Sequence, residues 1–92
     1  MIRLIIAGPR DYYDRENVFC HIHMFQGKFG IDEIVSGGAS GVDTLAEEYA
    51  NLYQIPFKLF PADWEKYGKA AGPIRNQQMA EYGNVLLAFD RG

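Results

Sequence analysis

The sequence predicts an α/β fold, a Rossmann-like three-layer α/β/α domain with a mostly parallel sheet of about four strands. Short apolar runs, typical of buried strands, alternate along the chain with segments whose apolar residues recur at helical spacing. This alternation is typical of βαβ units with right-handed crossovers and a parallel sheet. The chain has 92 residues and shows neither a repeat nor a linker, so we expect one domain over residues 1–92.

The first half of the chain begins with a strand, a helix and a second strand. The apolar run RLIIAG (residues 3–8) is expected to form a buried strand. Asp14 can cap the helix that follows, and Gly27 and Gly30 are expected to close it. The run DEIVSGG (residues 32–38) is the second predicted strand.

The second half continues the alternation. A helix with one continuous apolar stripe is expected at residues 42–53. Asp63 can cap a short helix, and a longer helix should start with Pro73 at its first helical position and end at Gly83. Two further strands, the last of them buried, are predicted at residues 56–62 and 85–90.

Sheets of this kind bind ligands in the crevice beyond the carboxyl ends of their strands. The segments that follow the four predicted strands are GPRDY, SGGASGVD, PADW and DRG. The unusual residues of the sequence lie in these segments, where this fold places a binding site.

The segment SGGASGVDT, which joins the second strand to its helix, has two interpretations. Glycines let a ligand approach the backbone, and a helix start presents free N–H groups to an anion, so a phosphate would lie on the backbone from Gly37 to Val42. Alternatively the segment is only a connection, with Ser40 as the N-cap and Asp43 in the first turn. The candidate binding residues here are Ser36, Gly37, Gly38, Ala39, Ser40, Gly41 and Asp43.

The carboxylate of Asp43 would repel a phosphate. Binding of ribose hydroxyls, as acids do in dinucleotide folds, or a bridging cation would remove this conflict. A carboxylate that only stabilises the start of the helix is the alternative.

Arg75 and Arg10 are the basic residues expected at the crevice. Arg75 lies in the first turn of its helix, where a cation interacts unfavourably with the helix dipole at a cost of roughly 0.3–1 kcal/mol. Its partner is therefore an anionic ligand or an acid of the protein. Arg10 follows the first strand and suits bidentate contacts to phosphate, or it pairs with a neighbouring aspartate.

Asn76 can contact a base edge or a ribose, and the ring of Trp64 either stacks on a base or packs.

Composition indicates which kinds of partner the protein binds and in which compartment it is found. The net charge of −3 argues against nucleic-acid binding. The single cysteine, Cys20, and the absence of an apolar stretch of membrane length indicate a cytoplasmic protein without a membrane partner. His21 and His23 point to different faces of a helix and form a poor chelate, so we expect no metal. The sequence indicates no cofactor, and no nucleophile–base–acid set identifies catalytic residues.

The motifs AGPRDY, IVSGGASGVDTLAEEYA, PADWEKYGKAAGPIRNQQM and VLLAFD occur in this order. Together they resemble the SLOG superfamily, named from the Smf (DNA-processing A) and LOG proteins, and most closely its small YspA-like branch. The resemblance implies a Rossmann-like domain that binds a nucleotide or nucleotide-derived ligand as a dimer or higher oligomer. The positions that it implies for the site are Gly8, Arg10, Gly37, Gly38, Gly41, Asp43, Gly72, Arg75 and Asn76.

The sequence departs from this family pattern in two places. Members of the branch usually continue past the last strand into a second glycine-rich turn and a helix, whereas this sequence stops at FDRG. The motif PGGxGTxxE, which carries the catalytic acid of LOG phosphoribohydrolases, does not occur. We therefore expect a nucleotide-binding sensor or accessory module. The alternatives are a phosphoribohydrolase or N-glycosidase acting on nucleotides, and single-stranded DNA binding.

Overall fold

Four strands form one all-parallel sheet in the computed structural model, which describes residues 1–90. The strands are β1 (Arg3–Ala7), β2 (Glu33–Ser36), β3 (Phe57–Leu59) and β4 (Val85–Ala88). Their spatial order is β3-β2-β1-β4, so β1 and β2 are internal and β3 and β4 lie at the edges. The register pairs Leu4 with Ile34 on one side and with Val85 on the other. These pairings confirm the predicted parallel α/β fold.

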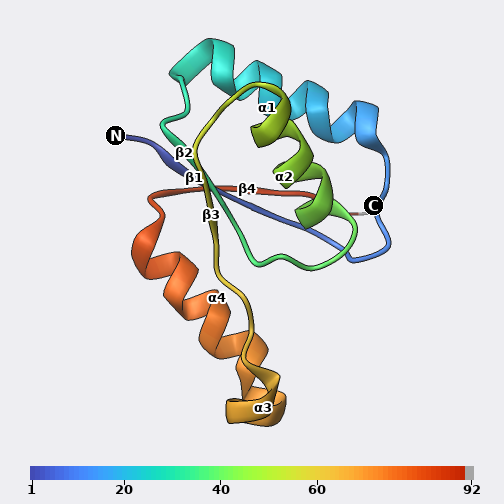
Figure 1. Cartoon of the computed structure of the whole chain (residues 1–92). Helices are drawn as coiled ribbons and strands as arrows, with labels where there is room; N and C mark the ends of the chain where they lie inside the picture. The colour runs from blue at the N-terminus through green and yellow to red at the C-terminus, as the bar shows by residue number, and fades with distance from the viewer. Residues whose placement is uncertain (91–92) are drawn as a thin grey trace.

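The helices form the outer layers. α1 (Arg15–Phe29) and α2 (Val42–Leu52) lie on one face of the sheet, and α4 (Ala71–Tyr82) lies on the other (Figure 1). α3 (Trp64–Tyr67) and the 3₁₀ turn η1 (Gly68–Ala70) extend away from the sheet before α4 begins (Figure 1). Within residues 1–90, no helix is both long and apolar enough to cross a bilayer.

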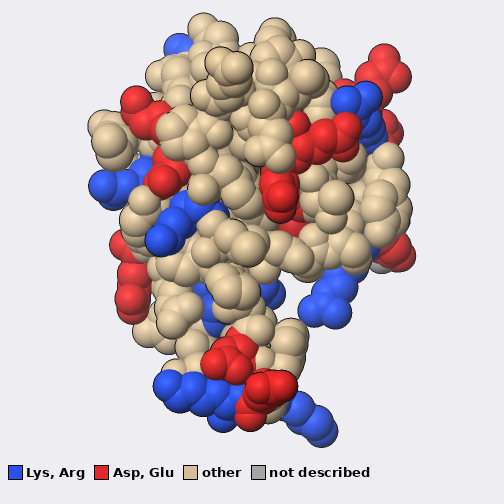
Figure 2. All heavy atoms as spheres, in the orientation of Figure 1, with Lys and Arg blue, Asp and Glu red and all other residues tan. Residues whose placement is uncertain are grey.

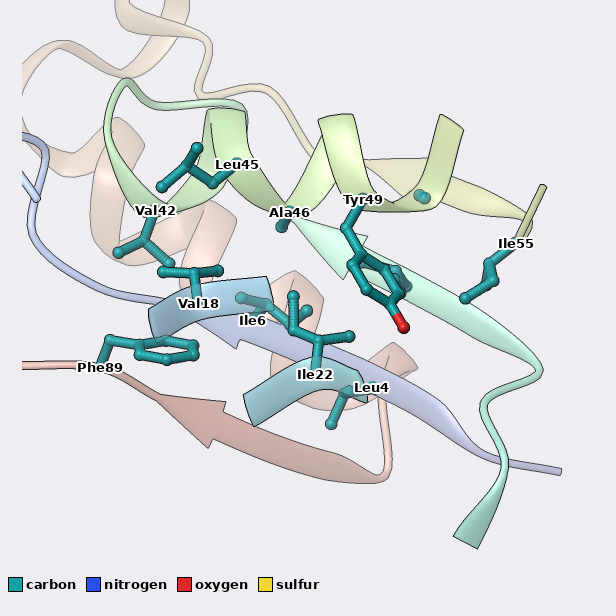
Figure 3. Close-up of a cluster of buried hydrophobic side chains, with 12 residues drawn as sticks. Leu4, Ile6, Val18, Ile22, Val42, Leu45, Ala46, Tyr49, Ile55 and Phe89 are labelled. Atoms are coloured by element: carbon teal, nitrogen blue, oxygen red, sulfur yellow. The ribbon is translucent and has the colours of Figure 1, made fainter. Parts of the chain in front are cut away.

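The core lies mainly between the sheet and the α1–α2 layer. Successive side chains of a strand point to opposite faces, so Leu4 and Ile6 of β1 face this layer while Ile5 faces α4. Val18 and Ile22, four residues apart on one side of α1, pack against Leu4 and Ile6 (Figure 3). The smaller cluster on the α4 side is made by Ile5, Val35 and Met79.

The boundaries of α1 follow the expected capping with one correction. The Asp14 side chain accepts a hydrogen bond from the backbone N of Asn17 at 3.1 Å, as an N-cap does. Gly30 is the C-cap, whereas Gly27 lies inside the helix, so the prediction that Gly27 closes it was wrong. A single glycine inside a helix costs about 1 kcal/mol, which the packing of a 15-residue helix absorbs.

α4 and β4 differ from the predictions. α4 starts at Ala71, so Pro73 is its third residue and not its first; the ring is tolerated because first-turn N–H groups lack helical partners. β4 is not a buried strand, since Leu86 is 62% exposed. Met79 covers the α4-side face at Ile5 and Val35, away from the β4 edge. The glycine-rich turn expected after this strand would begin at the chain end, where residues 91–92 lie outside the described residues.

Candidate functional site

A cavity of about 320 Å³, which we call the main cavity, opens beyond the carboxyl ends of β2 and β3. One side is polar and is formed by residues 37–40, with the side chains of Arg10 and Arg75. The other side is formed by the loop after β3 and carries apolar groups, among them Leu59 and Trp64. The main cavity therefore presents two cations opposite an apolar wall.

Arg75 is half-buried, and two neutral acceptors hold its guanidinium in place. Nη1 donates to the carbonyl oxygen of Gly37 at 2.8 Å, and Nε donates to Oδ1 of Asn76 at 2.9 Å. Among residues 1–90, the side chains of Arg75 and Arg10 are not within ion-pair distance of any carboxylate. Both guanidiniums thus bring positive charge to the main cavity without a direct ion pair, although the charge of Arg75 also acts on the buried Asp43.

The β2–α2 turn, residues 37–41, is held by hydrogen bonds from its own amides. The amide of Gly38 donates to Oγ of Ser36 at 3.3 Å, and the amide of Ala39 donates to Oδ2 of Asp43 at 3.0 Å. Thr44 donates its hydroxyl to the carbonyl oxygen of Ala39 at 3.2 Å. These bonds fix the shape of the turn and use two of the amides that the sequence suggested for a phosphate.

The N-cap of α2 is Gly41, so the alternative interpretation of this segment was wrong in taking Ser40 as the cap. Gly41 has φ 73° and ψ −126°, a conformation that residues with a Cβ rarely adopt. The Ser40 hydroxyl instead donates to the carbonyl oxygen of Arg10 at 3.0 Å. This bond ties the loop after β1 to the β2–α2 turn, and it leaves Ser40 lining the main cavity.

Asp43 lies beneath the turn, in the first turn of α2 as expected, and is only 8% exposed. Burial raises the pKa of its carboxyl group above the ordinary value. The hydrogen bond from Ala39, the charge of Arg75 and hydrogen bonds from Ser36 and Gly37 act in the opposite direction. The carboxylate therefore accepts several donors of the turn and braces it from inside.

Half of the residues singled out from the sequence meet at one place. The residues that line the main cavity are Arg10, Gly37, Gly38, Ala39, Ser40 and Arg75. The candidates that do not line it are Gly8, Ser36, Gly41, Asp43, Gly72 and Asn76. Gly72, for example, is buried beside the ring of Trp64. Sequence reasoning missed Leu59 and Pro61, although Pro61 begins the segment PADW after the third predicted strand.

Comparison with known proteins identifies the family of this chain. Residues 2–67 match the profile of YAcAr, the YspA, cpYpsA-related SLOG family. The chain belongs to this family. The matched region of this YAcAr-family protein contains Arg10 and the β2–α2 turn, and it ends before Arg75. Membership supports a nucleotide-related role for its Rossmann-like fold.

A phage protein resembles the whole of this chain. The Gene 61 protein of Mycobacterium phage D29 is 37% identical over 100 aligned residues. The alignment covers 100% of this chain and 79% of that relative, and the relative's name states no activity. No solved structure matches the chain.

Proposed function

We propose that this protein binds the phosphate group of a nucleotide or nucleotide-derived molecule in the main cavity. The observation that carries the proposal is the pair of arginines, Arg10 and Arg75, which line one cavity without a carboxylate partner among residues 1–90. Guanidinium groups form short, charge-assisted hydrogen bonds with phosphate oxygens, often in pairs.

The groups that we assign to the phosphate differ from those that the sequence suggested. Gly38 and Ala39 already use their amides within the protein, so they offer less to a ligand than the sequence suggested. The amide of Ser40 donates to no acceptor within residues 1–90, and Ser40 lines the cavity at the start of α2. We therefore assign the phosphate to the two guanidiniums and the Ser40 amide.

The opposite wall supplies a surface for the rest of a nucleotide. Trp64 is 51% exposed and Leu59 is 44% exposed, and both line the cavity. An exposed indole is a stacking platform for a base, worth about 1–3 kcal/mol in proteins that bind single-stranded nucleic acids. Asp43 is kept from the phosphate because it faces the turn and not the cavity, so its role is to position residues 36–39.

Calorimetric titration of the whole chain with inorganic phosphate and the four nucleoside 5′-monophosphates tests this proposal. We expect at least one nucleotide to bind more tightly than phosphate alone. Arg75→Ala should weaken that binding about 10- to 100-fold, since a hydrogen bond to a charged group contributes about 1.5–3 kcal/mol. Arg10→Ala should weaken it less, because Arg10 is exposed and its charge is screened by salt.

Lys28→Ala is the matched control. It removes the same charge from the last turn of α1, outside the lining of the main cavity, and should leave nucleotide affinity within twofold of the parent chain. The proposal fails if no nucleotide binds, or if Lys28→Ala weakens binding as much as Arg75→Ala does, since the effect would then reflect net charge and not the site.

A further inference from the structure

A second hollow of about 220 Å³, which we call the side cavity, adjoins the main cavity. Pro61 and Arg75 line both of them. The guanidinium that we assign to the phosphate therefore lies at the boundary of two spaces, and a group bound to it has room on either side.

The side cavity differs chemically from the main cavity. Its apolar lining includes Ala71, which is 1% exposed, and the half-buried Ile74. Its polar lining carries both charges, and Figure 2 shows acidic and basic side chains next to one another around α3 at the lower end of the molecule. Besides Arg75, the charged residues that line the side cavity are Asp63 and Lys66.

These two charges are engaged locally. Oδ1 of Asp63 accepts a hydrogen bond from the backbone N of Lys66 at 3.1 Å. The Lys66 ammonium lies 5.1 Å from the ring centroid of Tyr67. The side-chain amide of Gln78 forms no hydrogen bond within residues 1–90, and it offers both a donor and an acceptor. Such a lining suits an uncharged polar group with an apolar face, a pentose or a nucleobase, better than a second phosphate.

Size indicates that the two cavities serve one ligand. Small-molecule pockets usually enclose about 300–1,000 Å³, so the main cavity lies near the lower limit and the side cavity falls below it. Building on the proposed phosphate site, we propose that the natural ligand is a nucleotide whose phosphate carries organic groups on both sides, as in a dinucleotide. One group lies against Trp64 in the main cavity, Arg75 binds the phosphate at the boundary, and the second group occupies the side cavity.

Two probes that share a base test this inference by calorimetry on the whole chain. They are adenosine 5′-monophosphate and 5′,5′-linked diadenosine monophosphate, in which a single phosphate carries an adenosine on each side. We call the diadenosine compound the two-armed probe, because its phosphate carries an organic group on each side. We expect it to bind at least tenfold more tightly than adenosine 5′-monophosphate. Gln78→Trp fills the side cavity and should reduce this ratio to about one. Gln77→Trp places the same ring one residue away on α4, outside the lining of both cavities, and should keep the ratio.

The possible outcomes separate the two proposals. Equal affinity for both probes, or a tenfold preference that survives Gln78→Trp, overturns the two-armed ligand while the phosphate site stands. Failure of inorganic phosphate and of both probes to bind overturns the phosphate site and the two-armed ligand together. If Gln78→Trp does not fold by circular dichroism, Tyr67→Ala, which removes a 39% exposed ring from the same cavity, replaces it with the same expected loss of preference.

Discussion

Gly37 and Gly41 lie four residues apart in the β2–α2 turn, but the space beside their Cα atoms is filled by different groups. A Cβ on Gly37 would overlap the guanidinium of Arg75, the flexible end of a side chain. A Cβ on Gly41 would overlap the backbone of Pro9 and Arg10, and its φ of 73° disfavours any side chain. The first glycine therefore makes room for the side chain of Arg75, and the second serves the fold.

Alanine substitutions separate these two roles. Gly41→Ala should lower the free energy of unfolding by at least about 2 kcal/mol, because the strained backbone and the overlap add together. Gly37→Ala should cost less than about 1 kcal/mol of stability, since Arg75 can move aside, yet it should weaken nucleotide binding about tenfold. Urea unfolding and calorimetry measure the two effects, and equal stability losses would contradict the assignment.

Asp43 should make the folding stability of the protein depend on pH. Its pKa is raised in the folded protein, so between the unfolded value of 3.8 and the folded value the folded state binds the extra proton. The contribution of Asp43 to stability is therefore fully present below pH 3.8 and is lost as the pH rises through the folded pKa. Asp43→Asn lacks this titration.

Urea unfolding of the parent chain and of Asp43→Asn at several pH values measures this contribution. The stability of the parent relative to the variant should fall as the pH rises from below 3.8 through the folded pKa. A relative stability that rises with pH would show that the hydrogen bonds from Ala39, Ser36 and Gly37 outweigh the effect of burial.

At the scale of elements, local capping signals were reliable where a side chain could reach its own helix. Asp14 and Asp63 both cap as predicted, each accepting a hydrogen bond from the amide three residues later. The α2 cap was mispredicted because the Ser40 hydroxyl bonds to Arg10, which is distant in the sequence. A local pattern cannot anticipate a competing acceptor that the fold brings from another loop.

Substitution of Asp14 tests how much the N-cap of α1 contributes to stability. Asp14→Ala should lower the free energy of unfolding by about 1 kcal/mol, because the amide of Asn17 loses its acceptor. Asp14→Asn keeps an acceptor at the same position and should stay within a few tenths of a kcal/mol of the parent chain. Chemical denaturation measures both values, and equal losses in the two variants would contradict the capping role.

At the scale of the whole molecule, the sheet is covered unevenly. Leu4 is fully buried under α1 and α2, whereas Leu86 on the β4 edge is 62% exposed on the α4 side. The apolar pattern of the last strand suggested burial, but burial depends on where α4 crosses the sheet. α4 packs through Met79 on the central strands, and this leaves the β4 edge uncovered on that face.

The same substitution on two strands measures this asymmetry. Leu4→Ala should lower the free energy of unfolding by about 2–5 kcal/mol, because it leaves a cavity in the larger core. Leu86→Ala should change it by less than about 0.5–1 kcal/mol, since the side chain is mostly in water. Urea unfolding of both variants gives the comparison, and a large loss for Leu86→Ala would indicate that another surface covers this face.

The sequence by itself determined the order of the elements, the parallel α/β fold and the segments that lie at the carboxyl ends of the strands. Those properties follow from apolar periodicity, capping residues and the right-handed connection of parallel strands, all of which act over short stretches of chain. It also predicted that Arg10 and Arg75 lie at the same crevice, and both line the main cavity.

Only the tertiary structure decided which polar groups remain available to a ligand. Asp43 turns inward to the amide of Ala39, and Arg75 is held by the carbonyl oxygen of Gly37, 38 residues away in sequence. Loop amides and charged side chains take whichever partners the fold brings near, because a buried polar group without a partner costs free energy. The glycine-rich turn is thus braced by the protein itself, and the side chains of Arg10 and Arg75 remain at the main cavity, where we propose that an anion binds.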